Sequence, residues 1–506
     1  MAISIRNPGK LFRLLSIITL LFITCWGLLL VLIQIKPFWV DEWRIIYNLK
    51  YKSATALFGP LDFMQQFPRI YLVLIKLFTS FFDYSYFTLR LPSFLVGTFT
   101  IIFSYRLMRK MYPSCNLNRF LFIMILISSY AFTEYFVQIK QYTMDILLSL
   151  VALWQMAALL KLKDNNTTGR YTLLCISLFI VPFFSYTYPI AIAPVFIIMF
   201  LQSATGIINK EYKSSTTILL KQWFALALSV MGIILFYVID VSQLMADKGM
   251  HQFWGHLIMD NGFSCKLLIT NFYLLFAQVG SGLFFSIVFG ILGIISFFYG
   301  IRKAYTMLLK NTNRPPDFYL FYSILLLVLV IALFIVGKFP LGESRLNAFT
   351  VPSISILIIY FLDRMNNEKY KVKFSPFISA LLYIGAIGHI YTHSFAAITG
   401  PVYAREMNIY RSTENAIKLA QEKKLPILVT PGIAYPYDKT PNLPFKNTVP
   451  GDWVLKTFPA YKINENIPVY PLTCLCNLKE YMDQLPEDIT AVLAGDGRSY
   501  NIINRY

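Results

Sequence analysis

The sequence predicts an all-α membrane protein that crosses the bilayer about eleven times and ends in a small α/β domain. Of its 506 residues, 57% are hydrophobic and only 14% are charged, whereas about a quarter of the residues of soluble proteins are charged. Apolar runs recur along the chain at lengths near the ~20 residues that cross a bilayer. After about residue 395 these runs stop, and short segments with the periodicity of a soluble domain follow.

Eleven apolar runs are interpreted as transmembrane helices. The first follows Arg6, Lys10 and Arg13 and is interpreted as an uncleaved span, because it is longer than the core of a signal peptide and no small-residue cleavage site follows it. Residues 68–82 are apolar but short, which favours an interfacial helix over a span. The eleven predicted spans are 12–35, 87–105, 120–137, 143–161, 171–187, 189–207, 222–241, 282–301, 318–337, 347–362 and 376–394.

Basic residues set the predicted orientation. The net charge of +19 is spread over short loops between apolar runs, which favours membrane orientation over nucleic-acid binding. With the N-terminus in the cytoplasm, every inner loop carries at least three Lys or Arg: 106–119, 161–170, 209–221, 302–317 and 363–373. The outer loops hold far fewer cations for their length: 138–142, 186–189, 242–281 and 338–345. The unusual polar residues and the tail after residue 394 therefore fall on the extracytoplasmic side.

The C-terminal segment 395–506 is predicted to be an extracytoplasmic α/β domain, separate from a transmembrane domain over 1–394. Residues 411–424 have helical periodicity, 425–432 read as a buried strand and turn, and 477–497 predict a helix, a turn and a strand. At roughly 100 residues the segment is long enough for a core of its own. It contains no glycine-rich phosphate-binding motif, so we expect it to recognise an acceptor or to stabilise the protein.

Two adjacent acids, Asp41 and Glu42, follow the first span and are flanked by Trp39 and Trp43. On a helix their side chains would point about 100° apart, and on a strand to opposite faces. They are therefore predicted to have different roles, one facing a site and the other holding the segment in place. The alternative is a solvated turn at the membrane interface, with both tryptophans in the aromatic belt.

The order of several short motifs resembles the GT-C superfamily of glycosyltransferases, in particular the bacterial relatives of the protein O-mannosyltransferases and the aminoarabinose lipid A transferases. The first 160 residues carry most of the resemblance, and the 338–360 region carries the rest. The matching segments are Asp41-Glu42, Phe67-Pro68-Arg69-Ile70-Tyr71, Leu89-Arg90-Leu91-Pro92-Ser93, Gln138-Ile139-Lys140-Gln141-Tyr142, and Glu343-Ser344-Arg345 with Pro352. Two positions depart from the family: Arg69 replaces a proline, and Lys140 replaces an arginine that can bind phosphate through two nitrogens.

The resemblance implies a GT-C fold in the bacterial inner membrane. It implies transfer of a hexose or pentose from a polyprenyl-phosphate donor to a hydroxyl of a lipid, glycan or protein acceptor in the cell envelope. Asp41 matches the family's general base, and Glu42 would orient its loop or the acceptor. Arg69, Lys140, Tyr142 and Arg345 are the candidates for binding the donor phosphate. A single displacement at the anomeric carbon implies inversion.

Each candidate also has a plain structural interpretation. Arg90 is expected to extend its guanidinium to the membrane interface, and Lys140, Tyr142 and Arg345 would also suit interface anchors. His389 and His393 lie four residues apart without a third ligand in the sequence nearby, which favours a structural or interfacial pair over a metal site. Whether the protein uses a divalent cation stays open.

Two other classes remain as alternatives. A transporter or flippase of lipid-linked sugars should carry midplane charges or internal repeats, and none is evident in the sequence. A GT-C-like fold without activity is disfavoured by the Asp41-Glu42 pair.

Overall fold

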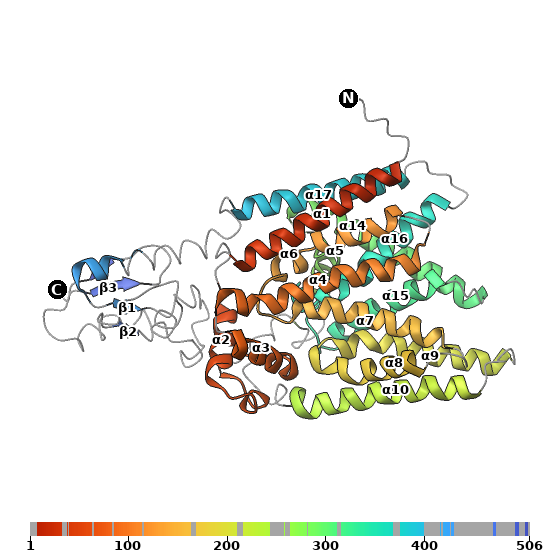
Figure 1. The fold of residues 1–506 in the computed structure, drawn as a ribbon. Helices are drawn as coiled ribbons and strands as arrows, with labels where there is room; N and C mark the ends of the chain where they lie inside the picture. The colour runs from red at the N-terminus through yellow and green to blue at the C-terminus, as the bar shows by residue number, and fades with distance from the viewer. Residues whose placement is uncertain are drawn as a thin grey trace. The chain divides into compact units, whose positions relative to one another are not determined.

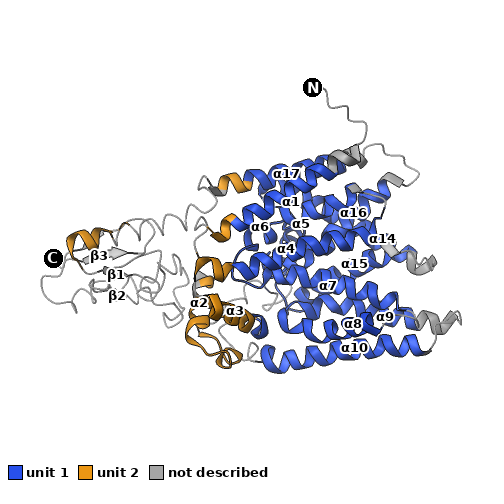
Figure 2. Ribbon diagram, viewed as in Figure 1, with its two compact units in different colours: residues 1–28, 68–71, 91–392 blue, residues 29–67, 72–90, 393–506 orange. Residues whose placement is uncertain are grey.

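The computed structural model describes most of the apolar part of the chain. The described residues are 8–32, 38, 40–62, 65–82, 85–113, 116–162, 168–209, 216–242, 258, 264–280, 282–310, 315–367, 375–398, 415, 418–425, 427–429, 469–471, 491–494 and 501–503. The chain forms two compact units, coloured separately in Figure 2. Unit 1 comprises Met1–Leu28, Pro68–Tyr71 and Leu91–Thr392, and unit 2 comprises Leu29–Phe67, Leu72–Arg90 and His393–Tyr506.

Unit 1 is a bundle of helices lying side by side (Figure 1). Its α-helices are α1 (Pro8–Leu32), α4 (Tyr86–Met111), α5 (Asn116–Ser128), α6 (Tyr130–Tyr135), α7 (Tyr142–Leu160), α8 (Thr168–Ile180), α9 (Tyr188–Asn209), α10 (Thr216–Phe236), α13 (Cys265–Ala277), α14 (Leu283–Lys310), α15 (Pro315–Ile335), α16 (Val351–Asn367) and α17 (Ser375–Ile398). Short 3₁₀ turns, η3 (Val181–Phe184) and η6 (Ala348–Thr350), precede α9 and α16, and the π-turn η4 (Tyr237–Val241) extends α10. The last residues of α1 and α17 and the first of α4 belong to unit 2.

Helix α16 is the most buried of the seven long apolar helices among the described residues. It packs against α5, α14 and α15, and 78% of its most apolar 18-residue window is buried. A helix that is apolar on all sides is stable only when other helices or lipid surround it. The 347–362 segment, whose apolar residues are not confined to one face, therefore forms a core helix of unit 1.

Seven of the described helices are long and apolar enough to cross a membrane, and four shorter apolar helices accompany them. The chain is thus a multi-pass membrane protein, as predicted, whereas the number of eleven spans stays a prediction. The connection 242–281, interpreted from the sequence as a loop, contains helix α13, which packs along α14. His251 and His256, also in this connection, lie outside the described residues.

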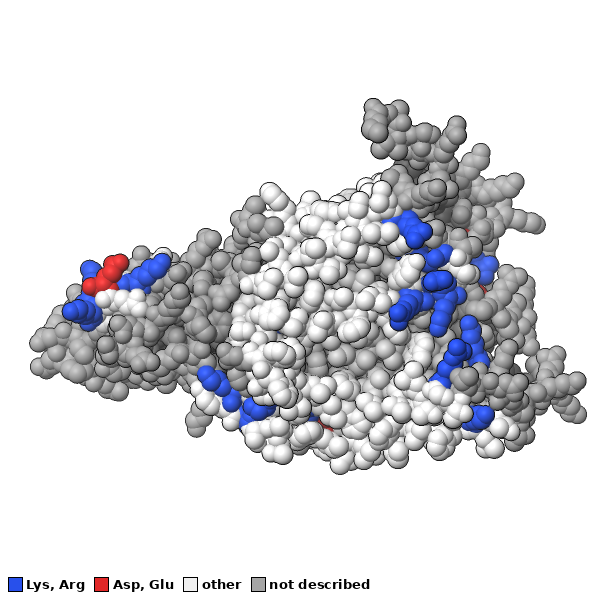
Figure 3. Space-filling model, in the orientation of Figure 1, with Lys and Arg blue, Asp and Glu red and all other residues white. Residues whose placement is uncertain are grey.

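Basic side chains gather at one end of unit 1 (Figure 3). They come from the predicted inner ends of α1, α4, α8 and α14 and from the residue after α7, and their exposed members are Arg13, Arg106, Arg109, Lys110, Lys161, Arg170 and Arg302. Helices that alternate in direction bring these segments to the same end. The bundle therefore has the charge asymmetry expected of a protein oriented by the positive-inside rule.

Unit 2 contains α2 (Val40–Tyr51), the 3₁₀ turn η1 (Ala56–Phe58) and most of α3 (Arg69–Phe82). Residues 69–82 form the predicted helix, and Lys76 in it donates a 2.6 Å hydrogen bond to the carbonyl of Leu49 in α2. Asn48 holds the following loop by exchanging hydrogen bonds with the backbone of Asp62.

Four short strands of unit 2 form one sheet in the order β2-β1-β3-β4. They are β1 (Ile427–Val429), β2 (Val469–Pro471), β3 (Ala491–Ala494) and β4 (Asn501–Ile503). β1 runs parallel to β2 and β3, whereas β4 is antiparallel to β3. Parallel neighbours require crossover connections, which suits the predicted α/β pattern. The existence of an independent domain over 395–506 stays a prediction.

Candidate functional site

Asp41 and Glu42 lie in the first turn of α2, where acids are favourable because the exposed backbone N–H groups make this end of a helix positive. Glu42 is fully buried, and its Oε2 lies 3.3 Å from Nη2 of Arg90, which is also fully buried. The carboxylate of Glu42 is therefore held within unit 2 by an ion pair between α2 and the start of α4.

Arg90 packs against two aromatic rings, Phe38 and Tyr86, which also contact each other. Its guanidinium carbon lies 4.7 Å from the ring centre of Phe38 and 4.6 Å from that of Tyr86. The expectation that Arg90 extends to the membrane interface is wrong, because Glu42 and the two ring faces supply charge and polarisable surface inside the protein.

Asp41 has a different environment from its neighbour. Its Oδ1 lies 3.7 Å from Nη1 of Arg44, one turn along α2, and its side chain is 19% exposed. A pair at this distance with partial exposure is weak. The two adjacent acids therefore differ as their 100° separation predicted, and Asp41 has the more exposed side chain of the two.

In unit 1, Lys140 and Tyr142 lie at the start of α7. The chain between α6 and α7 makes a tight turn, in which Gln138 donates a 2.9 Å hydrogen bond to Glu134. Lys140 and Tyr142 are both buried, and the ring of Tyr142 lies 4.6 Å from that of Tyr135. The turn thus places a cation and a phenol hydroxyl at the predicted outer end of the bundle.

Arg345 lies in the loop between α15 and η6, with its Nε 2.9 Å from Oε1 of Glu343. The side-chain amide of Asn347 holds this loop by donating to three of its carbonyl groups, those of Pro340, Leu341 and Glu343. Gln278, at the end of α13, donates in turn to Oγ1 of Thr350 at 3.0 Å. The loop that carries Arg345 is therefore held by hydrogen bonds from the side chains of Asn347 and Gln278.

Helix α6 connects these two segments. Tyr135 contacts Tyr142, and Tyr130 at the start of the same helix donates its backbone N–H to the carbonyl of Gln278, which in turn holds Thr350. Consistent with this, η6 packs against α7. The 138–142 and 343–345 segments, about 200 residues apart in the sequence, meet at the start of α7.

Arg69 begins α3 and is buried. Its backbone N–H donates to Oδ2 of Asp240 at 2.8 Å, and its Nε lies 3.6 Å from Oδ1 of the same carboxylate. Tyr186 donates a 2.5 Å hydrogen bond to Oδ1 of Asp240. Two residues after Arg69, burial raises the pKa of Tyr71 to about 12. Ser185, the neighbour of Tyr186, donates to Asp145 in the first turn of α7, so the Arg69 segment reaches the same end of α7 as Tyr142.

Asp145 and Asp240 are not among the site residues predicted from the sequence. Asp145 accepts a hydrogen bond from Ser185, which also contacts Thr187 at 3.0 Å, and Asp240 holds Arg69. Both acids are buried at the ends of otherwise apolar helices. An acid within an apolar run is itself a signal of function, because burying it without a partner is costly.

No group of three or more His, Cys, Asp or Glu side chains that could hold a metal is found among the described residues. His389 instead lies with its ring 5.3 Å from that of Phe285. What unit 1 does offer is three cations, Arg69, Lys140 and Arg345, and the hydroxyl of Tyr142 around one helix start. Such groups bind the oxygens of a phosphate.

No family model and no curated protein matches this chain. Two solved structures of ArnT from Cupriavidus metallidurans are similar to it. The apo structure has a TM-score of 0.46 at 12% sequence identity, over 95% of this chain and 93% of that chain. The structure bound to undecaprenyl phosphate has a TM-score of 0.47 at 11% identity, over 96% of this chain and 93% of ArnT.

Proposed function

We propose that the protein is an integral-membrane glycosyltransferase of the GT-C type, which moves a sugar from a polyprenyl-phosphate donor to an acceptor hydroxyl on the extracytoplasmic face. One observation carries the proposal: contacts within unit 1 link the segments holding Arg69, Lys140 with Tyr142, and Arg345 to α7. Arg69 reaches it through Asp240 and the 185–186 turn, and η6, which follows the Arg345 loop, packs against it. These are the segments whose motifs resemble that superfamily.

The cations would act on the donor. As the bond between the anomeric carbon and the phosphate oxygen breaks, negative charge gathers on the lipid phosphate that leaves. Fixed positive groups in a poorly hydrated place stabilise that charge more than they stabilise the neutral sugar, which lowers the barrier. Lys140 is buried and Arg345 is fixed by its loop, so little reorganisation is needed as the charge develops.

Asp41 would act on the acceptor. The attacking hydroxyl must lose its proton as it bonds to the anomeric carbon, and a carboxylate within hydrogen-bond reach can accept it. Glu42 is held by Arg90, so its role is to position the start of α2. One carboxylate suffices for a single displacement, which inverts the anomeric carbon.

The orientation follows from the basic residues. They gather at the end of unit 1 where α4 and α14 end, whereas Lys140 and Arg345 lie where α7 begins and before η6. If the basic end faces the cytoplasm, the phosphate-binding residues face the opposite side, as does the proposed domain over 395–506. We assign the protein to the bacterial inner membrane, with its acceptor in the cell envelope.

The test is accumulation of the lipid-linked sugar in cells whose only copy of the protein is Asp41→Asn, a change that removes the basic oxygen but keeps the shape. We expect the donor to accumulate on the outer face, where a membrane-impermeant oxidant that cleaves sugar diols can reach it. Accumulation on the inner face would indicate a flippase instead. Donor levels equal to those of wild type would remove Asp41 as the base.

A further inference from the structure

The structure holds Arg69 through a residue that no motif contains. We propose that Asp240 is the positioning residue for Arg69: it fixes the guanidinium so that the nitrogen left over can bind the donor phosphate. This inference rests on the proposed function, in which Arg69 contacts that phosphate. It identifies Asp240, with support from Tyr186, as a residue that positions a phosphate-binding side chain.

The carboxylate of Asp240 makes three contacts within unit 1. Oδ2 accepts the backbone N–H of Arg69 at 2.8 Å, while Oδ1 accepts the hydroxyl of Tyr186 at 2.5 Å and lies 3.6 Å from Nε of Arg69. The N–H groups of a first helical turn lack partners within their helix, so Asp240 caps α3 from a position 171 residues away. One side chain thereby holds both the backbone and the guanidinium of Arg69.

The guanidinium of Arg69 is left with unused donors. Arg69 is 5% exposed, and its Nη1 has no hydrogen-bond partner among the described residues. A buried N–H group without an acceptor costs about 1–3 kcal/mol, and more when it carries charge. An anionic oxygen placed at Nη1 would remove that cost. The arrangement therefore favours binding of a phosphate oxygen at the nitrogen that Asp240 does not engage.

Tyr186 has a supporting part in this arrangement. It precedes α9 and sits next to Ser185, which bonds to Asp145 in the first turn of α7. Tyr186 and its neighbour Ser185 therefore link Asp240 to the first turn of α7, which Lys140 and Tyr142 adjoin. Removing this hydroxyl should loosen Asp240 without changing any charge.

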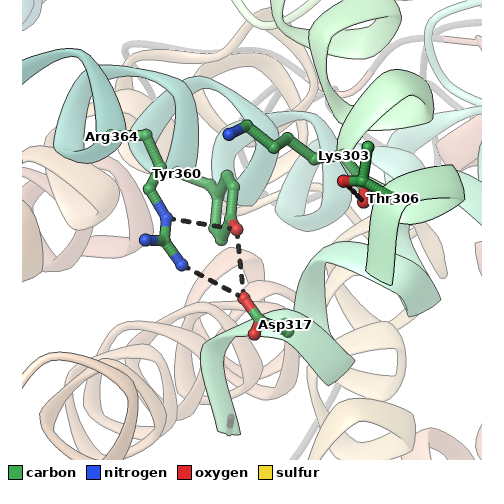
Figure 4. Close-up of polar contacts among 5 residues, drawn as sticks. All are labelled: Lys303, Thr306, Asp317, Tyr360 and Arg364. Atoms are coloured by element: carbon green, nitrogen blue, oxygen red, sulfur yellow. Dashed lines mark hydrogen bonds and ion pairs between the residues drawn. The ribbon is translucent and has the colours of Figure 1, made fainter. Parts of the chain in front are cut away.

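A chemically matched triad provides the control. At the basic end of unit 1, Oδ1 of Asp317 accepts the hydroxyl of Tyr360 at 3.0 Å and lies 3.4 Å from Nη2 of Arg364 (Figure 4). It has the same three residue types, and its Asp is also buried. The substitution Asp317→Asn should destabilise the protein much as Asp240→Asn does, and it should leave phosphate binding unchanged.

The experiment measures binding of a polyprenyl monophosphate to the purified full-length protein in detergent. We expect Asp240→Asn and Tyr186→Phe to weaken binding about tenfold and about threefold, and Asp317→Asn to have no effect. In a protein that already carries Arg69→Gln, adding Asp240→Asn should cause no further loss, because Asp240 acts through Arg69. Asp240→Glu should restore part of the affinity, since it retains the charge. Thermal unfolding of each variant confirms that the compared samples are folded.

Three outcomes would overturn the inference. If Arg69→Gln weakens binding while Asp240→Asn does not, Asp240 is only a tether, and the proposed function stands. If the two losses add in the double variant, Asp240 acts independently of Arg69. If the wild-type protein does not bind the polyprenyl monophosphate at all, the proposed function itself fails, and the inference fails with it.

Discussion

The buried pair of Glu42 and Arg90 allows a quantitative prediction about unit 2. Replacing Glu42 with Gln keeps the shape of the side chain and one carbonyl oxygen, but it removes the charge that faces Arg90. The two side chains lie 3.3 Å apart and neither has any exposed surface, so water cannot replace the lost carboxylate. Removing one partner of such a pair typically costs 3–5 kcal/mol.

The remaining contacts of Arg90 set the expected value within that range. The rings of Phe38 and Tyr86 still face its guanidinium, but each contact of this kind contributes only about 0.5–2 kcal/mol and is present in the wild type as well. The carbonyl oxygen of Gln can still accept a hydrogen bond, which favours the lower limit. We therefore expect Glu42→Gln to lower the free energy of unfolding by about 3 kcal/mol.

Denaturant titration in detergent micelles measures this change, with Asp62→Asn as the control. Asp62 also pairs with a cation, Lys52 at 3.2 Å, but its side chain is 49% exposed, and such pairs contribute at most about 1 kcal/mol. Replacing both Glu42 and Arg90 with Leu should recover most of the loss, because no uncompensated charge remains. A Glu42→Gln protein within 1 kcal/mol of wild type would refute the assignment of Glu42 to a structural pair.

Two further predictions concern unit 1. Arg345→Gln should lower the rate of sugar transfer roughly ten- to a hundredfold, the effect of losing a charge-assisted hydrogen bond of about 1.5–3 kcal/mol. A transfer assay in membranes measures this rate, with Lys338→Gln in the same loop as the control. Equal rates for the two variants would contradict the prediction. Gly97→Ala should destabilise the protein by about 1–3 kcal/mol although Ala normally favours a helix, because a Cβ atom at Gly97 would overlap the ring of Phe136. Denaturant titration measures the stability of the Gly97→Ala protein, and adding Phe136→Leu should relieve the overlap and restore stability. A Gly97→Ala protein more stable than wild type would refute this second prediction.

The features that were predictable from the sequence depend on local pattern. Apolar runs predict helices that cross the membrane, and the spacing of basic loops predicts the charged end seen in Figure 3. Asp41 and Glu42 were expected to differ because adjacent residues on a helix point in different directions. Their environments in α2 do differ.

The features that escaped prediction depend on pairing between distant residues. Arg90 resembles an interface anchor until Glu42, 48 residues earlier, is seen beside it. Asp240 stands at the end of a predicted span and gains its significance only from Arg69, 171 residues away. No periodicity encodes such a partner, because the contact depends on how the helices pack. Helix α13 was not predicted for a different reason. It follows a segment of mixed polar and aromatic residues, and the whole connection 242–281 was interpreted as one long loop.

The central claim is that Asp41 accepts the proton of the acceptor hydroxyl while Glu42 only supports the structure. The most direct test compares the pH dependence of transfer catalysed by wild-type, Asp41→Asn and Glu42→Gln proteins, each corrected for its folded fraction. The account predicts that Asp41→Asn loses transfer by at least a hundredfold, the usual contribution of a general base, and loses the acidic limb of the profile. Glu42→Gln should keep both the rate per folded molecule and the limb. An Asp41→Asn protein that retains the wild-type rate and profile would contradict the account.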